Sequence, residues 1–469
     1  MRLVRFILLA ALVAVWGQSA SAQIPQLSSR PTGAAVTLYL DFGGFNFGSG
    51  TWGGIWTDKL PGVTPAYTTD GSANFSATEV TNMREMWART SEMYSPFNIN
   101  VTTVDPAVAA GQAGSDDQRR SFYDSQFRMM HTVVGGTGSW YGGAGGISFI
   151  DVADTTNPGN PGSHTNFVFS DLFTINMVPG TFLKGIGEAM GHENGHALKL
   201  EHQSRWNGNA LDREYDPGTP LFQNPGPTAR APIMGESYQA DRALWRQGDA
   251  TTFPPPNFPT TKISQNDIGK IMTNNGIGGY VDSGIGHTRG TATALPMTGT
   301  TIDFNLAKGV VTPNNANPNT TNPNPIGEAN YTTDFYTIAV GPGGANVSVT
   351  LHSGRSTLTP GTADPGAMLD ATLRLLDGTG TVLQTSASDT FAETITVNDL
   401  AAGTYFFQIA SAGGFDAGNN ALYFDVGSYF LTGSIVPVPE PGLVLLAGAV
   451  GLGLRTAARR RKAARAGVS

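Results

Sequence analysis

The most informative stretch of this chain is GHENGHALKLEH, residues 191–202, which contains the pattern HExxH and a third histidine six residues later. On a helix, His192 and His196 lie four residues apart, so both imidazoles project from one face and can share a metal ion. Glu193 lies beside them without being a ligand and can hold a water molecule against that metal. With His202, the stretch supplies three imidazoles, an open fourth position and a carboxylate, which are the parts of a catalytic zinc site.

The alternative interpretation is a surface helix that carries ordinary polar residues. The chain has 7 histidines among 469 residues, and three of them fall within this stretch. A solvated helix has no reason to place rare histidines at ligand spacing, so the pattern favours the metal site.

The composition indicates an exported protein that is rich in strands and loops. Charged residues make up 14% of the chain, and it holds 60 glycines. The formal net charge of −8 becomes roughly −16 when the basic residues of the two ends are set aside. Such an acidic body argues against a nucleic-acid partner. The chain has no cysteine, which excludes disulfides and any cysteine-switch form of latency.

Residues 1–22 are predicted to be a secretory signal peptide. Arg2 and Arg5 precede the apolar run 6–15, and the small residues 20–22 form a cleavage site before Gln23. The alternative is an anchor that is not cleaved, but the apolar run is too short to span a bilayer.

The C-terminal segment 437–469 contains a second targeting signal. Residues 439–441 read PEP, and they precede an uncharged apolar run, residues 442–454, and the basic residues 459–462. Thirteen apolar residues are short for a stable span, and the basic end would stay on the cytoplasmic side. The segment resembles the PEP-CTERM sorting signal of Gram-negative bacteria. The resemblance implies transient inner-membrane association, processing by an exosortase-type enzyme, and release to the outside or the cell surface. A plain tail anchor is the alternative.

Strand and helix patterns alternate over residues 34–280 and predict a mixed α/β (or α+β) domain. Ser76 and Glu79 have the spacing of a capping box, and apolar residues follow at helical spacing, which predicts a helix over Ala77–Met93. The metal motif is expected on a helix over residues 181–200, and residues 105–129 are expected to form a loop with a short helix. Strands are predicted over residues 34–41, 97–104, 130–134, 146–152 and 166–170.

The pattern changes at about residue 282, after which short alternating strands predict an all-β sandwich over residues 282–435. The Asn-rich and Pro-rich residues 312–330 are expected to form a flexible loop or linker. His287 and His352 are isolated in this region, and both are interpreted as structural or surface residues. The predicted strands cover residues 335–340, 346–351, 371–376, 394–397, 403–409 and 421–429.

With these residues identified, the first domain resembles a metzincin-type zinc metalloprotease. The sequence HENGHALKLEH follows the metzincin pattern HExxHxxGxxH except at one position. APIMG, residues 231–235, resembles the Met-turn, and WYGGAGGIS, residues 140–148, resembles the strand that lies above the cleft and pairs with the substrate backbone. SPFNINVTTVDP, residues 95–106, resembles an early strand of bacterial relatives. The second domain resembles a bacterial pre-peptidase C-terminal domain through the segments DFYTI, LRLLDGTGTVL and LAAGTYFFQI.

The resemblance implies a secreted zinc endopeptidase that hydrolyses protein or peptide substrates. It implies that His192, His196 and His202 bind Zn²⁺, that Glu193 is the general base, and that Met234 is a hydrophobic floor under the metal. Tyr238, four residues after Met234, is a candidate for assisting the oxyanion. Structural Ca²⁺ is also plausible in an acidic exported protease, but no calcium motif locates it.

One residue departs from the family pattern. Lys199 occupies the position of a glycine whose left-handed conformation ends the helix, so that the third histidine turns back to the metal. A left-handed lysine costs roughly 1–2 kcal/mol, which zinc binding can outweigh. If the turn does not form, either an acidic residue such as Glu201 or Asp212 completes the site, or the site is weak. Two other classes therefore stay open: a surface or matrix protein with a degenerate protease fold, and an adhesion or carbohydrate-binding module built on the β-sandwich.

Overall fold

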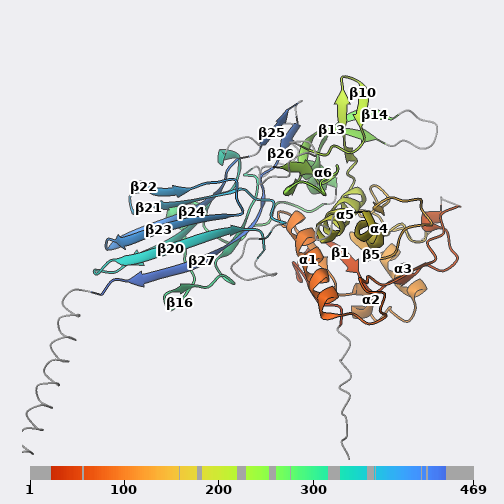
Figure 1. Ribbon diagram of the computed structural model, residues 1–469, viewed down its shortest axis with the longest axis horizontal. Coiled ribbons are helices and arrows are strands. Elements are labelled where there is room, and N and C mark those ends of the chain that lie inside the picture. Colours follow the sequence, from red (N-terminus) through yellow and green to blue (C-terminus); the bar gives the residue numbers. More distant parts are fainter. Residues whose placement is uncertain are drawn as a thin grey trace, which may run out of the picture.

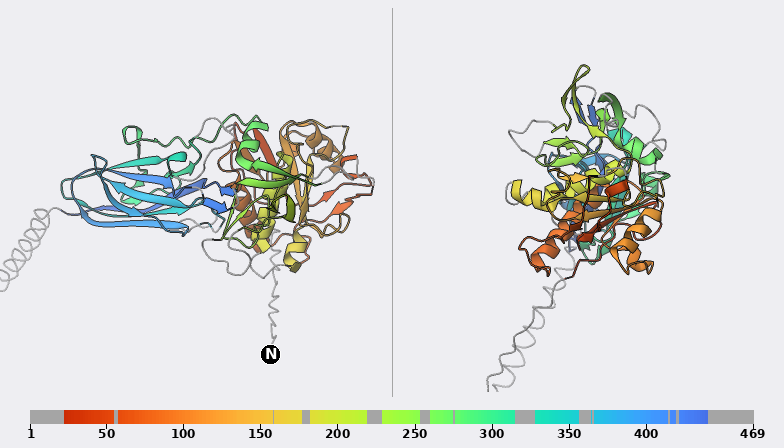
Figure 2. Two further views of the ribbon diagram at one scale, coloured as in Figure 1. Left: turned by 90° about the horizontal axis from the view of Figure 1, so that it is seen from above. Right: turned by 90° about the vertical axis from the view of Figure 1, so that its right-hand side faces the viewer.

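The computed structural model describes residues 23–439, apart from residues 55–57, 158, 177–181, 219–228, 253–259, 275, 315–327, 356–363, 365, 414, 419 and 420. It has an N-terminal part with a helix-covered sheet and a C-terminal β-sandwich, which lie side by side along the long axis (Figures 1 and 2). The predicted signal peptide, residues 1–22, and the predicted sorting signal, apart from residues 437–439, lie outside the described residues. Within the described residues, no helix is long and apolar enough to cross a membrane.

The N-terminal part is built on a five-stranded sheet with the order β4-β1-β5-β7-β6. Four of these strands run parallel, and β6 pairs with β7 in the antiparallel direction at one edge. Parallel strands of this kind are buried on both faces, and every residue of β4, β5 and β7 is buried. The strands are β1 (Val36–Asp41), β4 (Ile99–Thr102), β5 (Met129–Val134), β6 (Gly146–Ile147) and β7 (Thr165–Val168).

Helices cover both faces of this sheet. Met130 and Val134 of β5 belong to the core that includes α1 (Ala77–Met93) and α5 (Phe182–Ala197), which pack against each other. The alternate residues Met129 and Val133 belong to a second cluster beside α3 (Asp116–Ser125). The helix predicted over Ala77–Met93 is confirmed with its capping box, because Ser76 and Glu79 exchange their hydrogen bonds.

The sequence prediction was incomplete between these elements. Residues 105–129 contain two helices, α2 (Pro106–Ala109) and α3, where one was expected. The strand predicted over residues 146–152 ends at Ile147, and the strand over 166–170 ends at Val168 because Ser170 begins α4 (Ser170–Asn176). Two-stranded β2 (Phe45–Asn46) and β3 (Val63–Thr64) form a small separate sheet.

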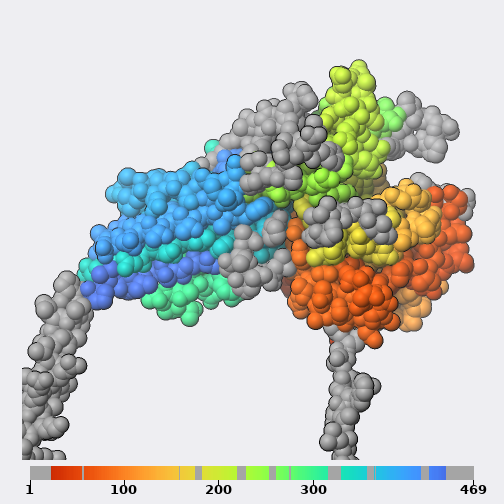
Figure 3. Space-filling view, viewed as in Figure 1, coloured from red at the N-terminus to blue at the C-terminus, as the bar shows by residue number. Residues whose placement is uncertain are grey.

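Short polar strands follow α5, and the sequence analysis did not predict them. The pair β9 and β10 forms a hairpin that projects from the surface (Figures 1 and 3). Pairing between β11 and β12 is parallel, whereas β13 pairs with both β8 and β14 in the antiparallel direction. The elements are β8 (His202–Gln203), β9 (Arg205–Asn207), β10 (Ala210–Arg213), β11 (Arg230–Pro232), β12 (Arg242–Leu244), β13 (Arg246–Thr252), β14 (Thr261–Asn266) and α6 (Asp267–Asn274).

The C-terminal part is the predicted β-sandwich. One sheet has the order β15-β19-β24-β21-β22, and the other has the order β16-β17-β27-β20-β23 with β18 paired to β27. Its strands are β15 (Thr293–Ala294), β16 (Met297–Thr298), β17 (Thr301–Ile302), β18 (Lys308–Val311), β19 (Asp334–Val340), β20 (Ala345–Ser353), β21 (Ala371–Leu376), β22 (Val382–Ser386), β23 (Ala392–Leu400), β24 (Gly403–Ser411) and β27 (Gly427–Pro437).

The strand predicted over residues 421–429 was wrong, and the error concerns the connection between the two parts of the chain. The segment 421–429 is not one sandwich strand: β26 (Ala421–Tyr423) leaves the sandwich, whereas β27 begins at Gly427. Together with β25 (Phe415–Gly418), β26 extends the sheet of β13 and β14 in the N-terminal part. The boundary expected near residue 282 therefore does not separate two independent sets of strands.

The remaining sequence expectations concern the loop and the two isolated histidines. Most of the loop expected over residues 312–330 lies outside the described residues, but its two ends are paired through Pro313 and Tyr331. His287 is exposed and lies 3.1 Å from Asp334, and His352 is buried with its ring stacked on Phe430. Both arrangements agree with structural roles for these histidines.

Candidate metal centre

Helix α5 and strand β8 bring three histidines to one point. His192 and His196 lie one turn apart on α5, and His202 is the first residue of β8. One nitrogen of each imidazole lies within 4.8 Å of the corresponding atoms of the other two, and the Nε2 atoms of His196 and His202 are 3.0 Å apart. Among the described residues, these three histidines are the one group of three or more His, Asp or Glu side chains close enough together to hold a metal ion.

The turn that carries His202 back to the helix forms in spite of the lysine. Lys199 has a φ of 80°, its backbone N–H donates to His196 O at 2.8 Å, and the N–H of Leu200 donates to Gly195 O at 3.0 Å. These two bonds are the Schellman pattern that ends a helix. The Nζ of Lys199 also lies 2.6 Å from Asp151 Oδ2, an exposed pair that contributes about 1 kcal/mol or less.

The two acidic residues considered as substitutes for His202 do not join the group. Glu201 precedes β8, where its N–H donates to Gln265 Oε1 at 3.0 Å. Asp212 lies exposed on the projecting hairpin. Neither residue is needed as a third ligand, because the left-handed turn at Lys199 places His202 beside His196.

The second nitrogen of each imidazole is held by the surrounding chain. His192 Nδ1 lies 2.9 Å from Ile233 O, and His196 Nδ1 lies 2.7 Å from Leu200 O. His202 Nδ1 lies 3.0 Å from Glu214 Oε1. Such contacts fix the tautomer and leave Nε2 for a metal.

The electrostatics of the group keep the histidines uncharged. Burial lowers the pKa of His192 to about 4. Burial also lowers the pKa of His196 and His202 well below the usual value, with a further decrease from the neighbouring imidazoles. Neutral imidazole is the form that binds metals, so the donors are ready at neutral pH.

Met234 lies in a turn between β11 and β12 that packs against α5. Gly235 N donates to Pro232 O at 2.9 Å, and Met234 is fully buried. A Cβ added to Gly195 would lie 2.5 Å from the Met234 sulfur, so the sulfur contacts α5 directly. The turn also contacts the histidine group, since Ile233 O contacts His192 and Met234 O accepts from Gln203 N next to His202.

Glu193 is buried in the cleft beside the histidines and is not a member of the ligand group. Burial raises its pKa well above the usual carboxyl value. Strand β6 passes close to it, because a Cβ added to Gly146 would lie 2.6 Å from Glu193 Oε1. A larger residue at position 146 would therefore displace this carboxylate.

The histidines and Glu193 line a cleft of about 560 Å³. Gly145, Gly146 and Ile147 border it at the edge strand, and tyrosines 141, 215 and 238 form part of its wall. Tyr238 packs edge-on against Phe173 at 5.3 Å, and burial raises the pKa of its phenol, which therefore stays protonated and able to donate.

Two residues of the cleft escaped the sequence analysis. The ring of Tyr215 lies 4.3 Å from that of His202. Glu214 contacts the same histidine, and burial raises the pKa of this carboxyl. Neither residue has a sequence signal, because both follow an exposed hairpin and reach the site only through the turn after β10.

The comparisons with known proteins concern the β-sandwich. Residues 332–411 match the family model of the bacterial pre-peptidase C-terminal domain. These residues form a pre-peptidase C-terminal domain. A solved structure of the same kind of domain, from the collagenase of Bacillus anthracis, is 18% identical and matches 29% of this chain and 87% of its own, with a TM-score of 0.16. No curated protein matches the chain. The pre-peptidase C-terminal domain supplies β19 to β24 of the sandwich.

Proposed function

We propose that this chain is a secreted zinc-dependent endopeptidase of the metzincin type. The observation that carries the proposal is the convergence of three neutral imidazoles and a buried carboxylate in one cleft, beside an edge strand. The pre-peptidase C-terminal domain supports a protease context, because such domains accompany secreted bacterial proteases.

The donor set fits zinc. Three histidine nitrogens with an open fourth position match the catalytic zinc sites of hydrolases, and each second nitrogen has a partner that orients the ring. His192, His196 and His202 would hold the ion, which when bound supplies Lewis acidity to a water molecule and to the scissile carbonyl.

The chain's own groups supply the proton transfers. A cation in the cleft favours the charged form of Glu193, against the burial that raises its pKa. Glu193 then accepts the proton of the attacking water and delivers it to the departing amine. Tyr238 stays protonated at neutral pH and can donate a hydrogen bond to the developing oxyanion.

The edge strand offers a place for the substrate backbone. β6 pairs with β7 on one side and is the last strand in the order of its sheet. An extended peptide can add to such an edge through main-chain hydrogen bonds, which would place its scissile bond near Glu193. Gly145 and Gly146 keep this edge free of bulky side chains.

The test compares the mature protein with Glu193→Gln and His192→Ala. Wild type should hold near-stoichiometric zinc and cleave casein. Glu193→Gln should keep the zinc and lose roughly 10²-fold or more in rate, because the amide cannot accept a proton. His192→Ala should lose the zinc as well. Cleavage by Glu193→Gln at the wild-type rate would contradict the mechanism. Zinc-loaded wild type that cleaves nothing would favour the degenerate surface or matrix protein, or a β-sandwich adhesion module.

Export and processing belong to the same proposal. The leader 1–22 and the PEP-containing tail predict a mature protein that lacks both, after action of an exosortase-type enzyme at the inner membrane of a Gram-negative host. Intact-mass measurement on protein from that host tests this, and a mass that includes residues 459–462 would favour a permanent anchor. Structural calcium stays an expectation without an assigned position.

A further inference from the structure

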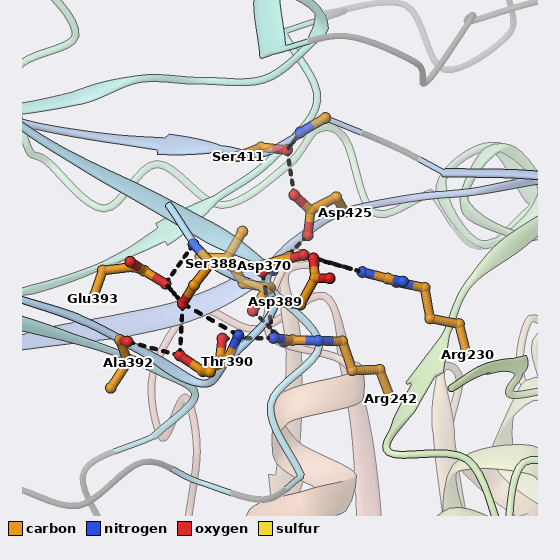
Figure 4. A network of polar contacts seen from close by, with 12 residues as sticks. Arg230, Arg242, Asp370, Ser388, Asp389, Thr390, Ala392, Glu393, Ser411 and Asp425 are labelled. Atoms are coloured by element: carbon orange, nitrogen blue, oxygen red, sulfur yellow. Dashed lines mark hydrogen bonds and ion pairs between the residues drawn. The ribbon is translucent and has the colours of Figure 1, made fainter. Parts of the chain in front are cut away.

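Two arginines connect the turn that holds Met234 to the β-sandwich through ion pairs. Arg230 lies in β11 and Arg242 in β12, on either side of the turn that holds Met234, and the two face each other in the strand pair. Both side chains reach across to the sandwich, as Figure 4 shows. Arg230 Nη2 lies 3.1 Å from Asp370 Oδ2, and Arg242 Nη2 lies 3.5 Å from Asp370 Oδ1.

Arg242 is the better buried of the two. Its side chain is fully enclosed, and it also donates to Leu369 O and, at 2.9 Å, to Thr390 O. Asp370 is 2% exposed, and its backbone N–H donates to Asp425 Oδ1 at 2.6 Å. A buried guanidinium needs its partners, because an unpaired buried charge is strongly unfavourable. The position of β11 and β12, and of the turn between them, is therefore tied to Asp370.

The strand that carries His202 is joined through backbone pairing to β26, which lies in the chain between β24 and β27 of the sandwich. β26 pairs with β13 through Tyr423 opposite Arg246. β13 pairs in turn with β8, where Thr251 lies opposite His202. A continuous ladder of main-chain pairing thus runs from β26, which is linked along the chain to the sandwich strands β24 and β27, to the third histidine.

Side chains reinforce this ladder near His202. Gln203 Nε2 donates to Asp267 Oδ1 at 2.7 Å, and Arg246 N donates to Asp267 Oδ2 at 2.9 Å. Arg246 Nη1 bonds Asp216 Oδ2, and Asp216 N donates to Gln203 O at 2.9 Å. All four residues are buried, and their hydrogen bonds connect β8 to β13 and to the start of α6.

We propose that the C-terminal β-sandwich is an integral part of the metal centre. It positions both the turn that holds Met234 and the strand that carries His202. The inference rests on the proposed zinc site and names Asp370 and Arg242 as positioning residues that act through β11 and β12. The domain is then not a removable accessory. Disturbing the contact should change metal affinity and ligand geometry at a site that the altered residues do not touch.

The test uses the full chain with Asp370→Asn, a nearly isosteric change that removes the charge between the two arginines. Zinc affinity is measured by chelator competition, and ligand geometry by the visible spectrum of the Co²⁺-substituted protein. We expect zinc affinity to fall about tenfold or more, an altered cobalt spectrum, and a lower kcat with little change in KM. Asp370→Glu, which keeps the charge, should recover part of each loss.

Asp399→Asn is the matched control, because Asp399 is an exposed residue of β23 in the same sandwich and its backbone conformation suits asparagine. It should behave as wild type. If Asp370→Asn gives no folded protein, Arg230→Gln at the less buried end of the network carries the test. A lower melting temperature with wild-type zinc affinity and cobalt spectrum would overturn the inference. A wild-type protein that binds no zinc would instead overturn the proposed function.

Discussion

The sulfur of Met234 packs directly against Gly195, at a place where an added Cβ would lie 2.5 Å from the sulfur atom. Gly195 is the residue before the second histidine of HExxH. Because the sulfur lies so close, a larger side chain at position 195 would overlap it. A helix interior otherwise disfavours glycine by about 1 kcal/mol relative to alanine. The close contact with the turn explains why a glycine lies here.

Gly195→Ala should destabilise the protein in spite of the better helix propensity of alanine. Overpacking of a buried contact costs typically about 1–3 kcal/mol, which exceeds the gain in propensity. Urea unfolding of Gly195→Ala, Met234→Ala and the double variant measures this. The double variant should lose less unfolding free energy than the sum of the losses in the two single variants, because Met234→Ala removes the overlapping sulfur. Strict additivity would show that the contact does not constrain the site.

Lys199→Gly should stabilise the protein relative to Lys199→Ala. Position 199 has a φ of 80°, where a residue with a Cβ costs roughly 1–2 kcal/mol and glycine does not. Both variants lose the exposed pair with Asp151, so the comparison isolates the backbone. The free energy of unfolding should differ by about 1 kcal/mol, and zinc should bind more tightly to the glycine variant. Equal stability of the two variants would mean that the turn is not strained.

Glu214→Ala should weaken zinc binding about tenfold or more without emptying the site. Glu214 contacts His202 Nδ1 at 3.0 Å, and partners of this kind orient a ligand and increase its basicity. Glu214→Gln keeps an acceptor and should lose less. Glu236→Ala is the control, because Glu236 also lines the cleft but pairs with Arg213 and not with a histidine. A zinc affinity that is equal in the Glu214 and Glu236 variants would refute this role.

Glu92 should make the contact between the two parts of the molecule sensitive to pH. It is fully buried, accepts hydrogen bonds from Ser428 N and Oγ, and lies 3.8 Å from Arg355 Nε. Burial raises its pKa to about 7 from an ordinary value of 4.5. The folded state therefore binds the proton more tightly, and the stability that this contributes is full below about pH 4.5 and lost as the pH rises through about 7.

Glu92→Gln removes this titration. The melting temperature of the variant, relative to wild type, should rise between pH 5 and pH 8, because only wild type must ionise a buried group over that range. Glu85→Gln, one turn before Arg89 on the partly exposed side of α1, provides the control, because it removes a carboxyl of the same helix that does not reach Ser428. A constant difference for Glu92→Gln would show that this carboxyl does not titrate in the folded protein.

The sequence correctly predicted those helices and strands whose boundaries depend on residues within or next to the element. α1 runs over Ala77–Met93 as predicted, because its capping box and apolar spacing lie within the helix itself. The spacing of His192 and His196 needed no tertiary information either, since four residues make one helical turn. The alternating strands of the sandwich were predicted from the same local pattern.

The sequence by itself thus determined the helix with two histidines, the adjacent carboxylate and the β-sandwich of the C-terminal part. Only the tertiary structure decided that Lys199 adopts the left-handed turn, that Glu214 meets His202, and that β26 joins β13. The strands around β13 are polar. They are stabilised by strand pairing and by ion pairs such as Arg246 with Asp216, so their sequences show no hydrophobic pattern. Contacts such as Arg242 with Asp370 join residues 128 positions apart, and no local rule of spacing can predict them.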